Sequence, residues 1–126
     1  MTRRPLLALI AAIAIAAPAC TALKDPEPWT KTVEYADAAD GSVRVTPLNF
    51  QADSSFGLVQ VVNDSSVKRG FAIDDLAVFE TIPPGLSKTV SVPEAKNHHT
   101  YVFYDQLHPH AFRGTIRVVF KSEQAR

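Results

Sequence analysis

The chain has 126 residues, which is enough for one domain and short for two. It carries 13 basic and 13 acidic residues, so its formal net charge at pH 7 is zero. The sequence contains no basic cluster of the size that a phosphate backbone requires, which argues against binding of nucleic acid. The single cysteine, Cys20, has no partner within the chain, so no internal disulfide can form.

The first 22 residues have the pattern of an export signal. Arg3-Arg4 is a charged start, residues 6–17 are an apolar run, and Ala17-Pro18-Ala19 resembles a cleavage site. The apolar run is shorter than the roughly 20 residues of a membrane-spanning helix. We therefore expect segment 1–22 to direct export to the periplasm, leaving 11 basic and 13 acidic residues and a net charge of −2. Two alternatives stay open: a twin-arginine export route and a lipid anchor on Cys20.

The remainder of the chain predicts short β-strands. Residues 23–32 contain two prolines and one tryptophan and predict a flexible lead-in, and residues 33–122 form the expected domain. Apolar and polar residues alternate in short runs that are separated by turn signals about every ten residues, which predicts seven or eight strands of an all-β sandwich. The strongest run, residues 56–62, has so few polar residues that we expect both of its faces to be buried.

One loop near the end of the domain carries the residues best suited to chemistry. The aromatic strand expected over residues 101–104 runs into Asp105, His108 and His110, and a second strand begins near Gly114. Because alternate residues of an extended segment face the same side, the two imidazoles could reach one ion together with the carboxylate. The alternative is that Asp105 caps the loop through backbone N–H groups while the histidines are solvated. No hydrolase or kinase motif is present.

Several segments together resemble a cupredoxin, the Greek-key sandwich of small copper proteins. The resemblance spans residues 33–119 and is carried by five groups of segments, namely residues 39–43, 61–64, 70–74 and 82–85, and residues 101–104 followed by His108-Pro109. In cupredoxins a histidine precedes the segment that resembles residues 70–74, and a cysteine and a second histidine follow the segment that resembles residues 101–104. The resemblance therefore implies a site at this end of the sandwich.

At the positions of the copper ligands this sequence departs from the family. Arg69 stands at the first histidine position and Asp105 at the cysteine position, while His108 keeps the second histidine. Blue copper requires a thiolate with two imidazoles, so we expect no type 1 electron-transfer site. A carboxylate with imidazole suits iron(II), manganese, zinc or copper(II) better than copper(I). Arg69 either pairs with Asp105 or contacts an anion or a partner, and Asp40 and Asp64 are candidate accessory residues.

The altered ligand pattern is similar to the cupredoxin-like components of bacterial ferrous iron uptake, both those of Ftr-type permease operons and those of the EfeO class. The resemblance implies a periplasmic metal-handling protein that binds iron(II) or assists its oxidation, at most as a ferroxidase-like redox partner. Its implied partner is a membrane iron permease or a second periplasmic iron-binding protein, and we expect a monomer or weak dimer. Two alternatives stay open: a metal-free cupredoxin-like interaction module, and a non-blue copper(II) carrier.

Overall fold

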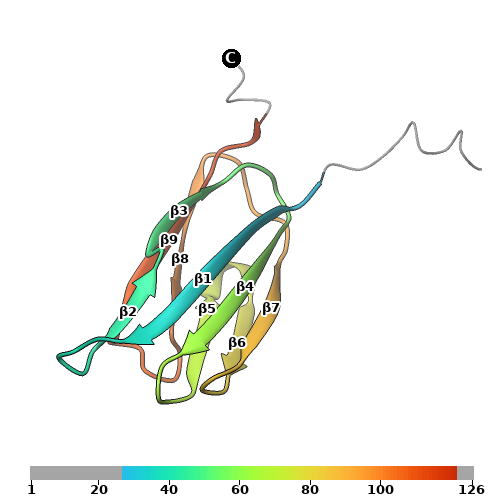
Figure 1. Ribbon diagram of the computed structural model, residues 1–126. Helices are drawn as coiled ribbons and strands as arrows, with labels where there is room; N and C mark the ends of the chain where they lie inside the picture. Colours follow the sequence, from blue (N-terminus) through green and yellow to red (C-terminus); the bar gives the residue numbers. More distant parts are fainter. Residues whose placement is uncertain (1–26, 122–126) are drawn as a thin grey trace, which may run out of the picture.

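The computed structural model describes residues 27–121, and within them the chain forms nine β-strands and one short 3₁₀ helix in two packed sheets (Figure 1). The first sheet has four strands, in the order β2 (Val43–Thr46), β1 (Trp29–Asp37), β4 (Gly57–Asp64), β7 (Ser87–Val92). The second sheet has five strands, in the order β3 (Asn49–Ala52), β9 (Arg113–Val118), β8 (His99–Tyr104), β5 (Arg69–Ile73), β6 (Val78–Ile82). The 3₁₀ helix η2 (Asp74–Leu76) joins β5 to β6. This architecture confirms the predicted β-sandwich and has one strand more than the upper number expected.

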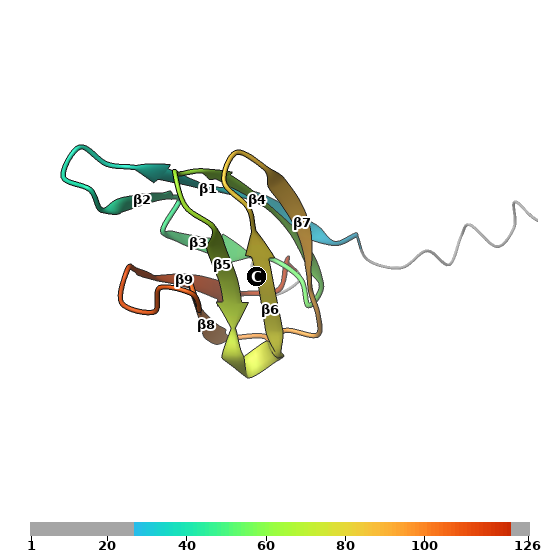
Figure 2. The same ribbon diagram turned by 90° about the horizontal axis from the view of Figure 1, so that it is seen from below.

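Many strands that are neighbours in a sheet are not consecutive in the sequence, so the sheets are not simple meanders. β1 pairs with β2 antiparallel but with β4 parallel, and β3 pairs with β9 parallel at the edge of the second sheet. The chain crosses between the sheets after β2, β3, β4, β6 and β7, and such crossings are the pattern of a Greek-key sandwich. Figure 2, seen from below, shows the two sheets as separate layers.

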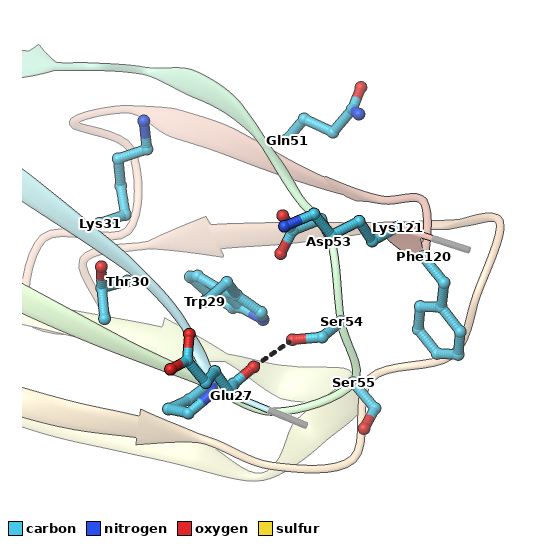
Figure 3. Close-up of a pocket in the computed structure, with 11 residues that line it drawn as sticks. Glu27, Trp29, Thr30, Lys31, Gln51, Asp53, Ser54, Ser55, Phe120 and Lys121 are labelled. Carbon is cyan, nitrogen blue, oxygen red and sulfur yellow. Dashed lines mark hydrogen bonds between the residues drawn. The ribbon is translucent and has the colours of Figure 1, made fainter. Parts of the chain in front are cut away.

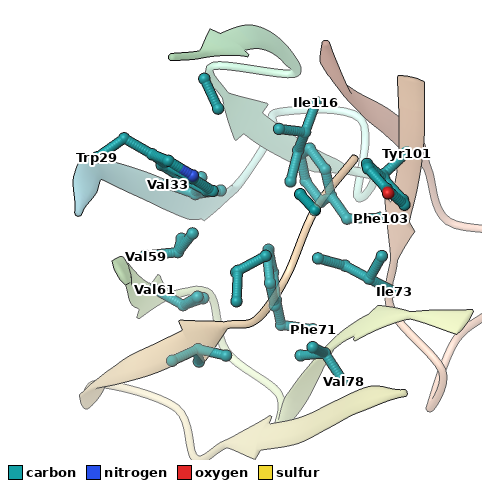
Figure 4. Packing of buried hydrophobic residues seen from close by; sticks show 14 of the residues in the cluster. Trp29, Val33, Val59, Val61, Phe71, Ile73, Val78, Tyr101, Phe103 and Ile116 are labelled. Carbon is teal, nitrogen blue, oxygen red and sulfur yellow. The ribbon is translucent and has the colours of Figure 1, made fainter. Parts of the chain in front are cut away.

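The core between the sheets is built from alternate residues of each strand. Phe103 of β8 lies near its centre, with its ring centroid 5.3 Å from that of Phe71 and 6.0 Å from those of Phe50 and Phe112 (Figure 4). Aromatic pairs at such separations add to the stabilisation that apolar burial provides. No helix within residues 27–121 is both long and apolar enough to cross a membrane.

Two details differ from the sequence-based expectations. β1 begins at Trp29, so residues 29–32 of the predicted lead-in are paired with β4 instead of flexible. The Trp29 ring is buried against Gly57, and this burial stabilises the paired conformation of residues 29–32. β4 buries one face fully, and on its other face Leu58 and Val62 are half-buried while Gln60 is exposed. The predicted signal segment 1–22 lies outside the described residues.

The strand connections place four loops at one end of the sandwich, at the bottom of Figure 1. These loops, which we call the rim, are residues 38–42, 65–68, 83–86 and 105–112. The 105–112 loop follows β8 directly and leads into β9, so two paired core strands hold both of its ends. The rim is therefore where the candidate residues meet.

Candidate functional site

Asp105 is the centre of the rim. Although it follows the last residue of β8, it is fully buried, with no exposed surface. Its Oδ1 atom accepts hydrogen bonds from the backbone N–H groups of Gly70 at 2.7 Å, Leu107 at 2.9 Å and His108 at 3.2 Å. Three N–H donors on one carboxylate oxygen satisfy that atom and fix the start of the loop.

The second carboxylate oxygen faces two nitrogen atoms of side chains. Asp105 Oδ2 lies 2.9 Å from Nδ1 of His108 and 3.5 Å from a guanidinium nitrogen of Arg69. Arg69 is itself only 7% exposed, so the guanidinium and the carboxylate compensate each other's charge away from water. Five donors thus surround one carboxylate, an arrangement that matches the capping role left open by the sequence.

A polar network extends from this carboxylate into the first sheet. Arg69 donates through Nε to Oγ of Ser65 at 3.2 Å, and Ser65 donates to the side-chain oxygen of Asn63 at 2.6 Å. The Asn63 amide in turn donates to the carbonyls of Val67 and Ile82, at 2.9 and 2.8 Å. Asn63 has no exposed surface, so from inside its side chain ties the 65–68 loop to the end of β6, where the 83–86 loop begins.

Tyr35 completes the interior of the rim. Its hydroxyl donates to the carbonyl of Gly70 at 2.9 Å, on the residue whose N–H binds Asp105. Burial, and then the nearby Asp105 charge, raise the pKa of Tyr35 well above its ordinary value. The phenol is therefore held neutral as a hydrogen-bond donor.

The structure brings Asp105 and His108 together but does not add His110 to them. The His108 side chain is 43% exposed and turns its Nδ1 edge toward Asp105. His110 is exposed in the turn that the N–H of Ala111 closes on the His108 carbonyl at 2.9 Å. Within residues 27–121, no three His, Cys, Asp or Glu side chains gather into a group that could hold a metal ion. The predicted three-residue metal site remains a prediction.

The accessory acids serve local roles. Asp40 is exposed and accepts from the Ser42 hydroxyl at 2.6 Å and from its backbone N–H at 3.0 Å, and these hydrogen bonds lower the pKa of Asp40. Asp64, at the exposed end of β4, raises the pKa of Glu34 through a side-chain hydrogen bond and through its charge. Neither acid forms a hydrogen bond or ion pair with Asp105, so the structure does not bring them into the site.

The residues that the sequence reasoning missed are Tyr35, Asn63 and Ser65. Asn63 and Ser65 stand in a run that reads as an ordinary turn, because Asn and Ser favour turns by bonding their own backbone. The Ser65 N–H does bond the Asn63 side chain at 3.0 Å, as such a turn requires. No signal in the sequence indicates that the same amide also reaches Ile82, 19 residues away.

One hollow lies away from the rim. It has a volume of about 710 Å³ at the other end of the sandwich and is lined by Glu27, Pro28, Trp29, Thr30, Lys31, Gln51, Asp53, Ser54, Ser55, Phe120 and Lys121 (Figure 3). Its charged side chains include two acids and two lysines, so it has no marked sign of charge. His98 and His99 are also far from the candidate site, because β8 begins at His99 and reaches the rim only after Tyr104.

The comparisons with known proteins concern the fold. No family model matches this sequence, and no curated protein matches it. Among solved structures, a purple cupredoxin from Nitrosopumilus maritimus is 17% identical with a TM-score of 0.51, and the match covers 70% of this chain and 98% of the cupredoxin. Reduced auracyanin from Roseiflexus castenholzii is 16% identical with a TM-score of 0.58, and the match covers 75% of this chain and 99% of the auracyanin. The chain has a cupredoxin-like fold.

A larger protein shares the same architecture. The McoA multicopper oxidase from Aquifex aeolicus is 9% identical with a TM-score of 0.61, and the match covers 77% of this chain and 30% of the oxidase. At such identities the likeness concerns the fold alone, and function depends on the site.

The residues of this cupredoxin-like rim do not fit type 1 copper. A blue copper site takes two imidazoles and a thiolate, with a weak axial ligand such as methionine. The chain has one cysteine and one methionine, Cys20 and Met1, and neither belongs to the rim loops. A guanidinium instead lies beside the Asp105 carboxylate, and the protein's own donors already engage both oxygens of that carboxylate. The cation in the interior of the rim is therefore an arginine side chain.

Proposed function

We propose that this cupredoxin-like chain is a docking component of an exported iron-uptake system, with the rim as its contact surface. The observation that carries the proposal is the closed state of Asp105, whose oxygens face five protein donors. A carboxylate engaged in this way stabilises the loops around it and is not open to an incoming ion. This arrangement leaves the outer surface of the rim as the part that can act on another molecule.

The outer surface of the rim carries exposed apolar side chains. Val67, Leu86 and Leu107 come from three different rim loops and are 41%, 57% and 42% exposed. We call these three residues the apolar rim. The backbones of Val67 and Leu86 both bond Asn63, so their loops are neighbours, and Leu107 directly precedes His108. Apolar side chains grouped around a polar centre are typical of protein-protein contact surfaces.

The proposed partner is a membrane iron permease or a second periplasmic iron-binding protein. This choice rests on the resemblance of the altered ligand positions to ferrous iron uptake components and on the export signal expected in residues 1–22. A monomer or weak dimer with a rigid rim suits a transient contact of this kind, since a preorganised surface loses little entropy on binding.

Photo-crosslinking in the source cells tests this proposal. A photoreactive residue replacing Leu107 should give a crosslink to the permease or to the iron-binding protein, identified by mass spectrometry, when cells are short of iron. The matched control is the same residue replacing Phe56, which is also 42% exposed but lies in the loop between β3 and β4, at the other end. Equal crosslinking from the two positions, or none from position 107, contradicts a docking rim.

A second candidate function, direct handling of iron(II) or copper(II), is favoured by one observation. The His108 ring is half-exposed and its Nδ1 edge alone is engaged with Asp105, so part of the predicted set of Asp105, His108 and His110 remains accessible. Anaerobic titration with iron(II), and then with copper(II), tests it. Equal affinity of the unaltered chain and of the Asp105→Ala, His108→Ala double variant contradicts it.

A further inference from the structure

We infer that the hollow at the end of the sandwich opposite the rim binds a small organic zwitterion of the amino-acid or short-peptide class. The hollow is a different surface from the docking rim, so this site does not depend on the proposed docking. Its volume of about 710 Å³ lies within the range of ligand pockets. Three segments that are far apart in the sequence, residues 27–31, 51–55 and 120–121, line it together (Figure 3).

The indole N–H of Trp29 is a hydrogen-bond donor without an acceptor. The residue is only 7% exposed, and within the described part of the chain its buried ring nitrogen has no hydrogen-bond partner. Buried donors in native proteins are nearly always satisfied, so this N–H marks a place for an acceptor. The nitrogen points toward Ser54 in Figure 3. The Ser54 hydroxyl lies 3.5 Å from the Glu27 carbonyl oxygen, a weak hydrogen bond, so a small shift of Ser54 lets a ligand oxygen approach the indole.

Two charged side chains of the hollow are half-buried. Lys31 is on the same side of β1 as the buried residues Trp29 and Val33, and Asp53 directly follows β3. Neither side chain forms a hydrogen bond or an ion pair with another described residue. The Lys31 ammonium lies 5.5 Å from the centroid of the Phe50 ring, a contact that uses none of its hydrogen bonds. A ligand that covers both charges must therefore supply a partner for each of them.

The charges around the hollow are balanced in sign. Its lining has the two acids Glu27 and Asp53 and the two lysines Lys31 and Lys121. A ligand with charge of one sign would meet repulsion as well as attraction there, whereas a zwitterion can place each of its charges beside an opposite one. The carboxylate of the ligand accepts from a lysine and from the indole N–H, and its ammonium donates to an acid. The half-buried ring of Phe120 adds apolar contact.

NMR titration with trialanine, a peptide with one ammonium and one carboxylate, tests the inference on the full chain. Trp29 is the only tryptophan, so the single indole N–H signal reports on the hollow directly. At millimolar trialanine we expect that proton to move downfield and to saturate, because it gains an acceptor. Trialanine blocked by an acetyl group and an amide lacks both charges and should bind at least about tenfold more weakly. An absent response, or an equal response to the blocked peptide, overturns the inference.

Two variants test the roles of the half-buried charges. Lys31→Gln and Asp53→Asn should each weaken trialanine binding about tenfold, because a neutral amide replaces a charged hydrogen-bonding group. The matched control, Lys68→Gln, alters an exposed lysine of the 65–68 rim loop and should leave the affinity unchanged. Unchanged affinity in either hollow variant contradicts the inference. Every outcome leaves the crosslinking test of the docking rim unaffected.

Discussion

At the scale of single residues, Asp105 decides how the rim is built. The carboxylate joins β5, through Gly70 and Arg69, to the loop that carries His108. Its position follows the last strand residue, where an acid in a loop is normally exposed, yet it has no exposed surface. The energetic consequence of such burial is asymmetric, because removing one member of a buried ion pair leaves the other without compensation.

Replacing Asp105 by Asn should therefore destabilise the protein strongly. The change removes the charge opposite buried Arg69 and turns an NH₂ group toward existing donors, so we expect the free energy of unfolding to fall by about 3 kcal/mol. Urea unfolding at pH 7 measures it. The matched control, Asp75→Asn, alters an exposed acid and should change the free energy by no more than about 0.5 kcal/mol. A loss no larger than that of the control would contradict the structural role of Asp105.

Tyr35 gives the rim a dependence on alkaline pH. Its pKa is raised in the folded state by burial and by the Asp105 charge, so above its ordinary pKa of about 10 only the unfolded chain releases the phenol proton. The unfolded state then binds fewer protons than the folded state, and stability is lost as pH rises. From pH 10 to pH 11, the free energy of unfolding should fall by up to about 1.4 kcal/mol because of this group.

The variant Tyr35→Phe isolates that effect. It lacks the ionisable hydroxyl, and it also loses the hydrogen bond to the Gly70 carbonyl, so it should be less stable than the unaltered chain at pH 8. The difference should shrink by about 1 kcal/mol or more by pH 11, as measured by urea unfolding at both pH values. A difference that is the same at both pH values would mean that Tyr35 is not held neutral in the folded protein.

At the scale of elements, the contact between β8 and β9 supports the site loop. Gly114 pairs with Phe103, and a methyl group on it would meet the Phe103 ring and the backbone carbonyl oxygen of Leu48, the latter at 2.5 Å. Neither neighbour can move easily, because one is central in the core and the other accepts a hydrogen bond from Thr115 at 3.0 Å. The glycine thus lets β9 and the β2–β3 connection approach each other closely.

Gly114→Ala should for this reason lower the free energy of unfolding by roughly 2 kcal/mol, within the range found for overpacked cores. Urea unfolding measures the loss, and Ser91→Ala, at an exposed position of β7, is the control expected to stay within about 0.5 kcal/mol. An unchanged stability of Gly114→Ala would show that β9 has room for a methyl group between Phe103 and Leu48.

Element by element, the strands were predictable to the extent that one face of each is apolar. In β7 and β8 the buried residues occupy alternate positions, as the alternating pattern predicts. The start of β1 was not predictable, because two prolines precede Trp29 and only the pairing with β4 keeps residues 29–32 extended. The tertiary fold decides which strands pair, and short-range sequence patterns do not reveal those pairs.

The candidate site was predictable in its location and less so in its internal contacts. Asp105 and His108 are close in sequence, and their proximity follows from a loop between two strands. The contacts of Asp105 with Gly70 and Arg69 span 35 and 36 residues, and Tyr35 reaches Gly70 across another 35. Such long-range contacts depend on which strands become neighbours. The sequence alone therefore left open whether Arg69 pairs with Asp105 or contacts an anion or a partner.

At the scale of the whole molecule, the two ends of the sandwich differ in character. The rim holds a buried ion pair and three exposed apolar side chains, while the other end holds the open hollow lined largely by polar residues (Figure 3). A rigid sandwich with its chemistry gathered in the loops of one end presents those loops in a fixed geometry.

The most direct test of this account is the protonation pattern of His108 in the metal-free chain, read from the ¹⁵N spectrum of its imidazole at neutral pH. We predict a ring protonated on Nδ1, with that proton protected from exchange by Asp105. His99, exposed at the far end of β8, serves as the internal reference and should exchange rapidly. A His108 ring protonated on Nε2 alone would show that Asp105 does not hold it, and would contradict the closed rim.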